Sequence, residues 1–336
     1  MSYKVIISNS IMQKGKPATA GSKMLENFIS PIDATVVERL KAAGVEILGT
    51  GMSDEFDISL LLGGQTNLTS DNGLVNLIAN GKADFAICND YTGAIGSAAA
   101  SQDLYYIHPT YGTVSRYGLI QAVSSIDQIG VLCTNIDIGF DVLDIISGYD
   151  SKDGAMKQGD GSLASSEKQR NHPLASTASN VSEVKPKFAE IYTQIMQIIC
   201  CAELSNNISR YDGVKYGYRT ESYNGLQEMY MNTRTEAFGE DIKLAAILGT
   251  MILSHENYTR YYEKATCLRR LIMDSMKFDT YDVTVGRGDD SSAMILLSRL
   301  CGLPSITIGD CTYVANKGNE PIIRETCKAS VLSNNS

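Results

Sequence analysis

The sequence predicts an α/β protein in which a mixed, mostly parallel sheet lies between helices. Three observations predict this fold class. Strand-like and helix-like segments alternate along much of the chain, which is typical of a sheet covered by helices. Several strand-like segments are apolar throughout, as expected of strands that are buried on both faces. The chain has 336 residues and a hydrophobic fraction of 43%, which is enough for the core of one large domain spanning 1–336.

The first half of the chain carries the alternation most regularly. Apolar residues that recur every three or four positions before a glycine predict helices. These expected helices are residues 32–44, 70–81 and 135–148. Asp33 is the candidate N-cap of the first helix, and Ser70 or Asp71 of the second. Short apolar runs predict strands, which are residues 4–8, 45–51, 83–88, 113–122 and 129–133.

The second half begins with a change in composition. Residues 149–186 hold almost no large apolar side chains, so they are expected to form a mobile polar segment at the surface. Beyond it, the pattern predicts long helices, with a break near Gly249 or Ser254 in the second of them. The expected helices are residues 187–209, 240–279 and 291–302, and the expected strands are 281–286 and 304–310.

Composition and charge exclude several classes of function. The net charge is −9, which makes nucleic acid an unlikely partner because such binding needs clustered Lys and Arg. No apolar run approaches the roughly 20 residues of a membrane span, and the first residues lack the pattern of a signal peptide. Eight scattered cysteines without a CxxC pair and three separate histidines predict no metal site and no cofactor. We therefore expect a reduced, cytoplasmic protein.

A set of ordered stretches carries a resemblance to a known family. They are "TAGSKMLENF" (19–28), "DATVVERLKAAGVEILGTGMSDEFD" (33–57), "PTYGTVSRYGLI" (109–120), "SSIDQIG" (124–130), "SRYDGVKYGY" (209–218), "TRTEAFGEDIK" (233–243), "LGTMILS" (248–254) and "YYEKA" (261–265). With these stretches the chain resembles the amidase signature family, and within it the A subunits of the glutamyl-tRNA(Gln) and aspartyl-tRNA(Asn) amidotransferases. The resemblance implies the family's fold in a shortened form.

The resemblance also implies where a Ser–Ser–Lys catalytic set would lie. In the family, one serine attacks the amide carbonyl, a second serine on a cis peptide relays the proton, and a buried neutral lysine is the base. The lysine position corresponds to Ser8, the relay position to Asp71 and the nucleophile position to Ala94. None of these residue types can perform its expected role. A pair of arginines that seats the family's substrate is also absent from residues 243–249.

Two serines near these positions are candidate substitutes for the nucleophile. Ser70 and Ser97 are close in sequence to the expected relay and nucleophile positions, but either would need a rebuilt geometry. Asp71 is expected to cap a helix, with a base or a contact to a cationic ligand as its alternative role. The ligand-binding residues implied by the resemblance are Asp90, Thr92, Gly93, Ala94 and Ile95 in one loop, and Tyr216 or Tyr218 near it.

The sequence leaves functions of different classes open. The first is a binding or complex-forming subunit that keeps an amidase scaffold without the amidase reaction, with a protein partner or further copies of itself. Its ligand would be a small amide or amino acid. The alternative is an enzyme on the same scaffold with altered amide or acyl-transfer chemistry. A third, minor hypothesis is an ammonia- or glutamine-handling subunit that still joins amidotransferase partners.

Overall fold

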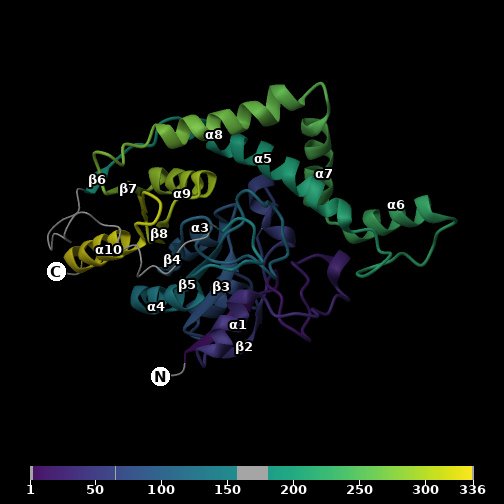
Figure 1. Ribbon diagram of the computed structural model, residues 1–336, viewed down its shortest axis with the longest axis horizontal. Helices are drawn as coiled ribbons and strands as arrows, with labels where there is room; N and C mark the ends of the chain where they lie inside the picture. Colours follow the sequence, from purple (N-terminus) through teal and green to yellow (C-terminus); the bar gives the residue numbers. More distant parts are fainter. Residues whose placement is uncertain (1–2, 65, 157–180, 335–336) are drawn as a thin grey trace.

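The computed structural model describes residues 3–64, 66–156 and 181–334, and its strands form one nine-stranded sheet (Figure 1). The strand order is β2-β1-β3-β5-β4-β8-β9-β7-β6. The strands are β1 (Lys4–Ser8), β2 (Glu46–Gly51), β3 (Phe85–Asn89), β4 (Tyr105–His108), β5 (Ile129–Cys133), β6 (Val181–Glu183), β7 (Val283–Arg287), β8 (Ser305–Ile308) and β9 (Cys311–Ala315). A mixed sheet between helices is confirmed.

The sheet differs from the prediction in strand direction. Three of its pairings are parallel, β1 with β2, β1 with β3 and β6 with β7, whereas the other five are antiparallel. One cause is the tight connection between β8 and β9. Gly309 adopts a positive φ of 53° there, and so short a turn joins only antiparallel neighbours.

Helices cover both faces of the sheet. On one face α1, α4 and α10 pack over the strands, and on the other α2, α3 and α9 do so, with α5 and α8 outside α9 (Figure 1). α7 packs along α5, and α6 lies at the far end of the molecule from α10. The helices are α1 (Thr35–Ala42), α2 (Leu74–Ala79), α3 (Ala94–Ala100), α4 (Ile136–Ile146), α5 (Tyr192–Asn207), α6 (Leu226–Ala237), α7 (Glu240–Leu253), α8 (Lys264–Asp274), α9 (Asp289–Cys301) and α10 (Glu320–Asn334).

Most of the expected elements are present, and the break in the long second-half helix falls at Ser254, after α7. The expected strand at 113–122 is wrong. That segment makes only isolated bridges, since Gly118 has a φ of 85° and lies against Ala34, which breaks the extended run. β2 is a strand but mostly exposed, because it forms an edge of the sheet. The sequence pattern did not predict β4, β6, β9, α3, α6 and α10.

Neither expected aspartate N-cap is used. α1 begins after Ala34, and Asp33 instead accepts a hydrogen bond from the Lys14 backbone and pairs with Lys41. α2 begins only after Gly73, with no side-chain cap, because a turn closed by the Gly73 N–H and the Ser70 carbonyl precedes it. Asp71 therefore lies exposed in a turn, outside the helix.

The polar segment expected at 149–186 lies partly outside the described residues, because 157–180 are not among them. Its two flanks make defined contacts. Asp150 accepts hydrogen bonds from Thr35 and Ser115, and Asp153 forms a buried ion pair with Arg116 at 3.0 Å. On the other side, β6 pairs with β7 at the end of the sheet. Acidic side chains that look like surface residues in the sequence thus anchor the first flank to the core.

Candidate functional site

The candidate site lies where β1 and β3 end. These strands are parallel neighbours, so their carboxyl ends meet at the same side of the sheet, where polar residues follow each strand. We call residues 8–10 and 89–96 together the β1–β3 edge. It contains two of the three positions that the family resemblance singles out, Ser8 and Ala94, as well as the loop that was expected to bind a ligand.

Asp90 organises the loop after β3. Its carboxylate accepts hydrogen bonds from the backbone N–H groups of Ile95 at 2.9 Å and Gly96 at 3.0 Å, at the start of α3. It also forms an ion pair of 2.9 Å with Arg299 of α9. The two side chains are 1% and 0% exposed, so both charges are satisfied within the protein. The N–H groups of Ile95 and Gly96 are therefore occupied by the loop's own carboxylate, rather than open to an external anion.

All three guanidinium nitrogens of Arg299 form hydrogen bonds, and two of them bond to Asp90. Its Nε donates to the Asp90 carbonyl at 2.9 Å, and its Nη1 donates to Ser298 and Ser305. The guanidinium also lies over the Tyr106 ring at 5.2 Å. A Cβ added at Gly96 would come within 3.1 Å of Nη2, so only glycine leaves this arrangement undisturbed. We call this group the Asp90–Arg299 clamp.

Ala94 is the first residue of α3 and is buried. Its methyl group lies where the family resemblance expects a nucleophilic oxygen. Gly93 before it has a φ of 81°, which turns the chain sharply into the helix. Ser97, one turn later, donates its hydroxyl to the Gly93 carbonyl at 2.9 Å, so that hydroxyl is directed back along the helix.

The other candidate substitute lies elsewhere. Ser70 is exposed in the turn before α2 and donates its hydroxyl to the Asn67 carbonyl at 2.7 Å. Within the described residues, no hydrogen bond joins Ser70 or Asp71 to the loop after β3. The structure thus buries Ser8 at the end of β1 and Ala94 at the start of α3, whereas Ser97 is exposed on α3, and Ser70 and Asp71 lie on an exposed turn.

Short polar side chains fill the space beside β1. The hydroxyls of Ser8 and Ser10 lie 3.0 Å apart, and both residues are buried. Ser53, from the segment after β2, donates to the side-chain oxygen of Asn9 at 2.8 Å. These groups hydrogen-bond one another, which lets polar side chains be buried without a ligand.

Asp57 is an acidic residue at this site that the sequence reasoning did not select. Burial raises its pKa well above the usual range, and the nearby carboxylates of Asp54, Asp90 and Asp127 raise it further, against the lowering effect of a hydrogen bond with Ser53. The carboxyl group is therefore stabilised in its protonated form.

The backbone at this point has an unusual shape. Phe56 and Asp57 have φ values of 48° and 56°, which residues other than glycine rarely adopt. The Tyr91 hydroxyl donates to the Phe56 carbonyl and so ties this turn to the loop after β3. Two consecutive strained residues persist only where surrounding contacts hold them, as here.

Tyr216 does not join the loop directly. It is 42% exposed, and its ring packs on Tyr211 at 6.3 Å between centroids. Tyr211 packs in turn on Phe56 at 5.7 Å. The five loop residues expected to bind a ligand are thus brought together, whereas Tyr216 lies at the outer end of an aromatic row that reaches them through two other rings.

Two residues were missed for different reasons. Arg299 is the only basic residue of α9 and follows an apolar run, and an arginine in a buried stretch of helix is a signal for a buried acidic partner. For Asp57 no sequence signal exists, because its environment depends on a turn that only the fold reveals. Among the described residues, no group of three His, Cys, Asp or Glu side chains is arranged to hold a metal ion.

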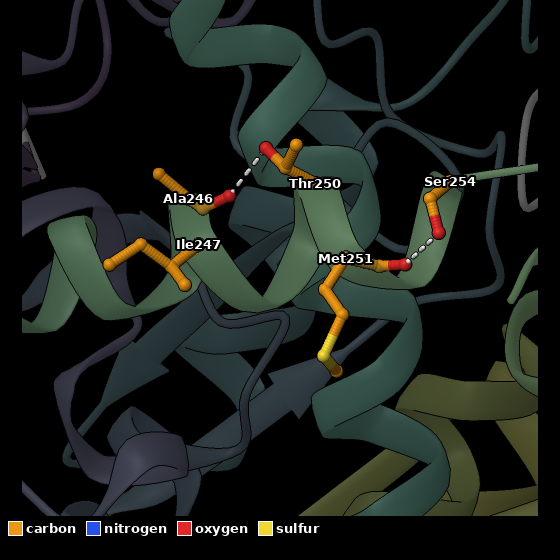
Figure 2. A pocket seen from close by; sticks show the side chains of 5 residues that line it. All are labelled: Ala246, Ile247, Thr250, Met251 and Ser254. Carbon is orange, nitrogen blue, oxygen red and sulfur yellow. Dashed lines mark hydrogen bonds between the residues drawn. The ribbon is translucent and has the colours of Figure 1, made fainter.

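A second candidate surface is the outer side of α7. Its inner side packs on α5 through Ile242, Ala245, Gly249 and Ile252, yet the outer side is also apolar. We call the outward Leu244, Ile247, Thr250 and Met251 the α7 face; Ile247 is 68% exposed. Part of this face borders an open hollow of about 540 Å³ (Figure 2).

The polar groups of the α7 face are already satisfied. Thr250 donates its hydroxyl to the Ala246 carbonyl at 2.7 Å, and Ser254 donates to the Met251 carbonyl at 2.8 Å (Figure 2). The side-chain atoms of the α7 face that remain available for contact with another molecule are therefore mainly carbon and sulfur. A helix that is apolar on both sides is typical of one buried on both sides. Nowhere in the described ranges is a helix long and apolar enough to cross a membrane.

The sequence model of the family described as Amidase matches residues 5–66, 70–178 and 168–286. The chain belongs to the amidase family. Among curated relatives, the A subunit of the glutamyl-tRNA(Gln) amidotransferase of Lachnoclostridium phytofermentans is 34% identical over 97% of this chain and 75% of its own length. The same-named protein of Symbiobacterium thermophilum is 30% identical, over 96% of this chain and 75% of its own length.

Solved structures of amidases have the same fold. The A subunit of the glutamyl-tRNA(Gln) amidotransferase of Thermotoga maritima superposes with a TM-score of 0.68 at 22% identity, covering 96% of this chain and 81% of its own. The peptide amidase of Stenotrophomonas maltophilia gives a TM-score of 0.69 at 17% identity, with 96% and 80% covered. The resemblance predicted from the sequence is therefore confirmed: the chain is an amidase-family protein similar to amidotransferase A subunits.

Proposed function

We propose that this protein is a non-catalytic binding or complex-forming subunit on an amidase scaffold. The observation that carries the proposal is Ala94. Covalent amidase chemistry needs an oxygen that attacks the amide carbonyl, and a buried methyl group offers no lone pair. The fold around that position is intact, so the loss affects the reaction and not the scaffold.

The neighbouring groups support the same conclusion. Ser97 uses its hydroxyl within α3, and Ser70 lies on an exposed turn. Ser8, at the expected lysine position, cannot act as the base that a neutral amine can. A neutral lysine needs burial to lower its pKa, and no lysine in the described part of the chain is buried.

The Asp90–Arg299 clamp gives the loop a structural role. Asp90 accepts hydrogen bonds from the backbone N–H groups of Ile95 and Gly96, which follow position 94 at the start of α3. The loop after β3 is thus held as a rigid part of the scaffold. A small amide or amino acid remains our proposed ligand, bound without turnover.

The α7 face is the surface that we propose for the partner. We commit to a different protein with an apolar helical surface, because the relatives named above are A subunits, a name that implies other subunits beside them. The apolar atoms of the α7 face and its internally satisfied hydroxyls fit such a contact.

All eight cysteines are free thiols, which agrees with a reducing compartment such as the cytoplasm.

Affinity capture from the native cells tests the proposal, followed by reconstitution of the captured protein with the purified chain. We expect a stoichiometric complex with the wild type. Ile247→Glu should abolish it, because a charge in the contact would have to be desolvated. Leu271→Glu is the matched control, since Leu271 is exposed on α8 outside the α7 face.

Two results would contradict this assignment. One is a complex that both variants weaken equally, which would place the contact elsewhere. The other is a homodimer of the purified chain, measured by light scattering, that Ile247→Glu dissociates. That outcome would make a second copy the occupant of the α7 face.

One observation favours the alternative, an enzyme with altered amide or acyl-transfer chemistry. Asp57 keeps its proton more readily than an ordinary aspartate and lies beside Ser53. A carboxyl group held protonated can donate a proton to a leaving group. Under this alternative, any turnover would be lost in Asp57→Asn, whereas Ser97→Ala would have no effect.

A further inference from the structure

A groove between α5 and the start of α8 combines an apolar floor with two positive charges. It has a volume of about 310 Å³, at the lower end of the range for small-molecule sites. Its floor is formed by Ile195 and Ile198 of α5 and by Leu268 of α8. α5 and α8 pack against each other along this stretch (Figure 1). We call it the α5–α8 groove.

Arg260 and Lys264 line the same groove. They are one turn apart, and like charges at this spacing repel each other slightly. Neither forms an ion pair or a side-chain hydrogen bond with any described residue, whereas Arg270, further along α8, pairs with Asp274 at 2.9 Å. Two unpaired cations beside an apolar floor leave the groove complementary to an anion.

The backbone here is also unusual. Residues Thr259–Glu263 form a π-helical turn directly before α8. A π-turn inserts an extra residue, occurs rarely and is frequent at functional sites. It carries Arg260 and Tyr261 to the groove, and the Arg260 guanidinium lies over the Tyr261 ring at 5.5 Å. The π-turn therefore places Arg260 at the groove, and Lys264, the first residue of α8, lines the same groove.

We propose that the α5–α8 groove binds a small amphipathic anion. Its head would be a carboxylate or phosphate between Arg260 and Lys264, and its apolar tail would lie on Ile195, Ile198 and Leu268. The guanidinium matches such a head because its N–H groups can pair with two oxygens at once. This site is independent of the β1–β3 edge and of the α7 face, so it does not depend on the proposed function.

Calorimetric titration of the full chain with straight-chain carboxylates from butanoate to octanoate tests the tail. Each added methylene should tighten binding about fourfold, as expected for one buried CH₂ group. Octanol and octylamine should bind at least about tenfold more weakly than octanoate, because they lack the negative head. Octyl phosphate in the same titration assigns the head, since the tighter of the two anions identifies its class.

Variants test the charges. The double variant Arg260→Gln/Lys264→Gln should weaken octanoate binding at least about tenfold, equivalent to losing a charge-assisted pair. Arg270→Gln removes one charge from the same helix outside the groove and should leave the affinity unchanged. Both sites are exposed, so thermal unfolding should be unaltered in each variant.

Three outcomes would overturn the proposal. They are an affinity that does not depend on chain length, octanoate binding that survives the double variant, and no saturable binding in the millimolar range.

Discussion

The β1–β3 edge and the α7 face differ in which side chains they bury and which they expose. At the edge, charged side chains are buried and satisfied by one another, as in the Asp90–Arg299 clamp. On α7, large apolar side chains are exposed, and the hydroxyls among them bond to their own helix. The region where the family resemblance places an amidase reaction is closed in on itself, whereas the outer side of α7 offers contact surface. The comparison favours a protein that works through binding.

The largest expected effect is on the clamp. Asp90→Ala leaves the Arg299 guanidinium buried without a carboxylate, so the free energy of unfolding should fall by about 3–5 kcal/mol. Urea denaturation followed by circular dichroism measures it. Lys41→Ala is the control, because it removes a half-exposed cation from the Asp33 pair and should cost at most about 1 kcal/mol. Equal losses of unfolding free energy in the two variants would show that the Asp90–Arg299 clamp contributes no special stability.

A smaller loss is expected from Gly93→Ala. Gly93 has a φ of 81°, and an added Cβ would lie 2.5 Å from Ile295 Cγ2. Backbone strain and overpacking together should cost about 2–3 kcal/mol. Gly81→Ala is the matched control, because Gly81 has a φ of 66° with open space around it and should show the strain alone, about 1 kcal/mol. Indistinguishable losses would show that the loop after β3 is loosely packed.

A gain in stability is expected from Asp57→Asn. The pKa of Asp57 is raised in the folded state, so the folded protein binds more protons than the unfolded one between the ordinary value of about 4 and the raised one. The wild type therefore loses stability as pH rises through that window, and the variant does not. At pH 8 the melting temperature of the variant should exceed that of the wild type by about 2–4 °C.

The pH dependence separates this explanation from simple packing. The advantage of Asp57→Asn should shrink as the pH falls through about 4 and disappear near pH 3, where the carboxyl of the wild type is protonated in both states. Exposed Asp71 provides the control, and Asp71→Asn should change nothing at either pH. A gain that is the same at both pH values would mean that the charge of Asp57 is not the cause.

The smallest effect on stability is expected on α7. Ile247→Glu alters an exposed side chain and should change the free energy of unfolding by no more than about 0.5 kcal/mol. In the same helix, Ile242→Glu buries a charge and should unfold the protein or nearly so. If Ile247→Glu is as harmful as Ile242→Glu, the outer side of α7 packs within the chain, and the contrast with the β1–β3 edge fails.

The sequence predicted the elements whose pattern is local. α4 appears where Asn135 precedes a clear apolar stripe, and the Asn135 side chain does cap it. By contrast, β4 became a strand through pairing with β8, which lies far away in the sequence, and no local pattern records that pairing. The prediction of mostly parallel strands failed partly because the short turn between β8 and β9 was not recognised as a hairpin. The resemblance to a family located Ala94, yet the Asp90–Arg299 clamp joins residues 209 positions apart and needed the fold.

Covalent labelling combined with ammonia release tests the central claim most directly. The chain is incubated with a fluorophosphonate probe and analysed by intact mass, and ammonia is measured with glutamine, asparagine and simple amides as substrates. A catalytically active amidase serves as the positive control. Our account predicts no added mass and no ammonia above buffer. A probe adduct, or ammonia release that disappears in Ser97→Ala or Ser70→Ala, would contradict it.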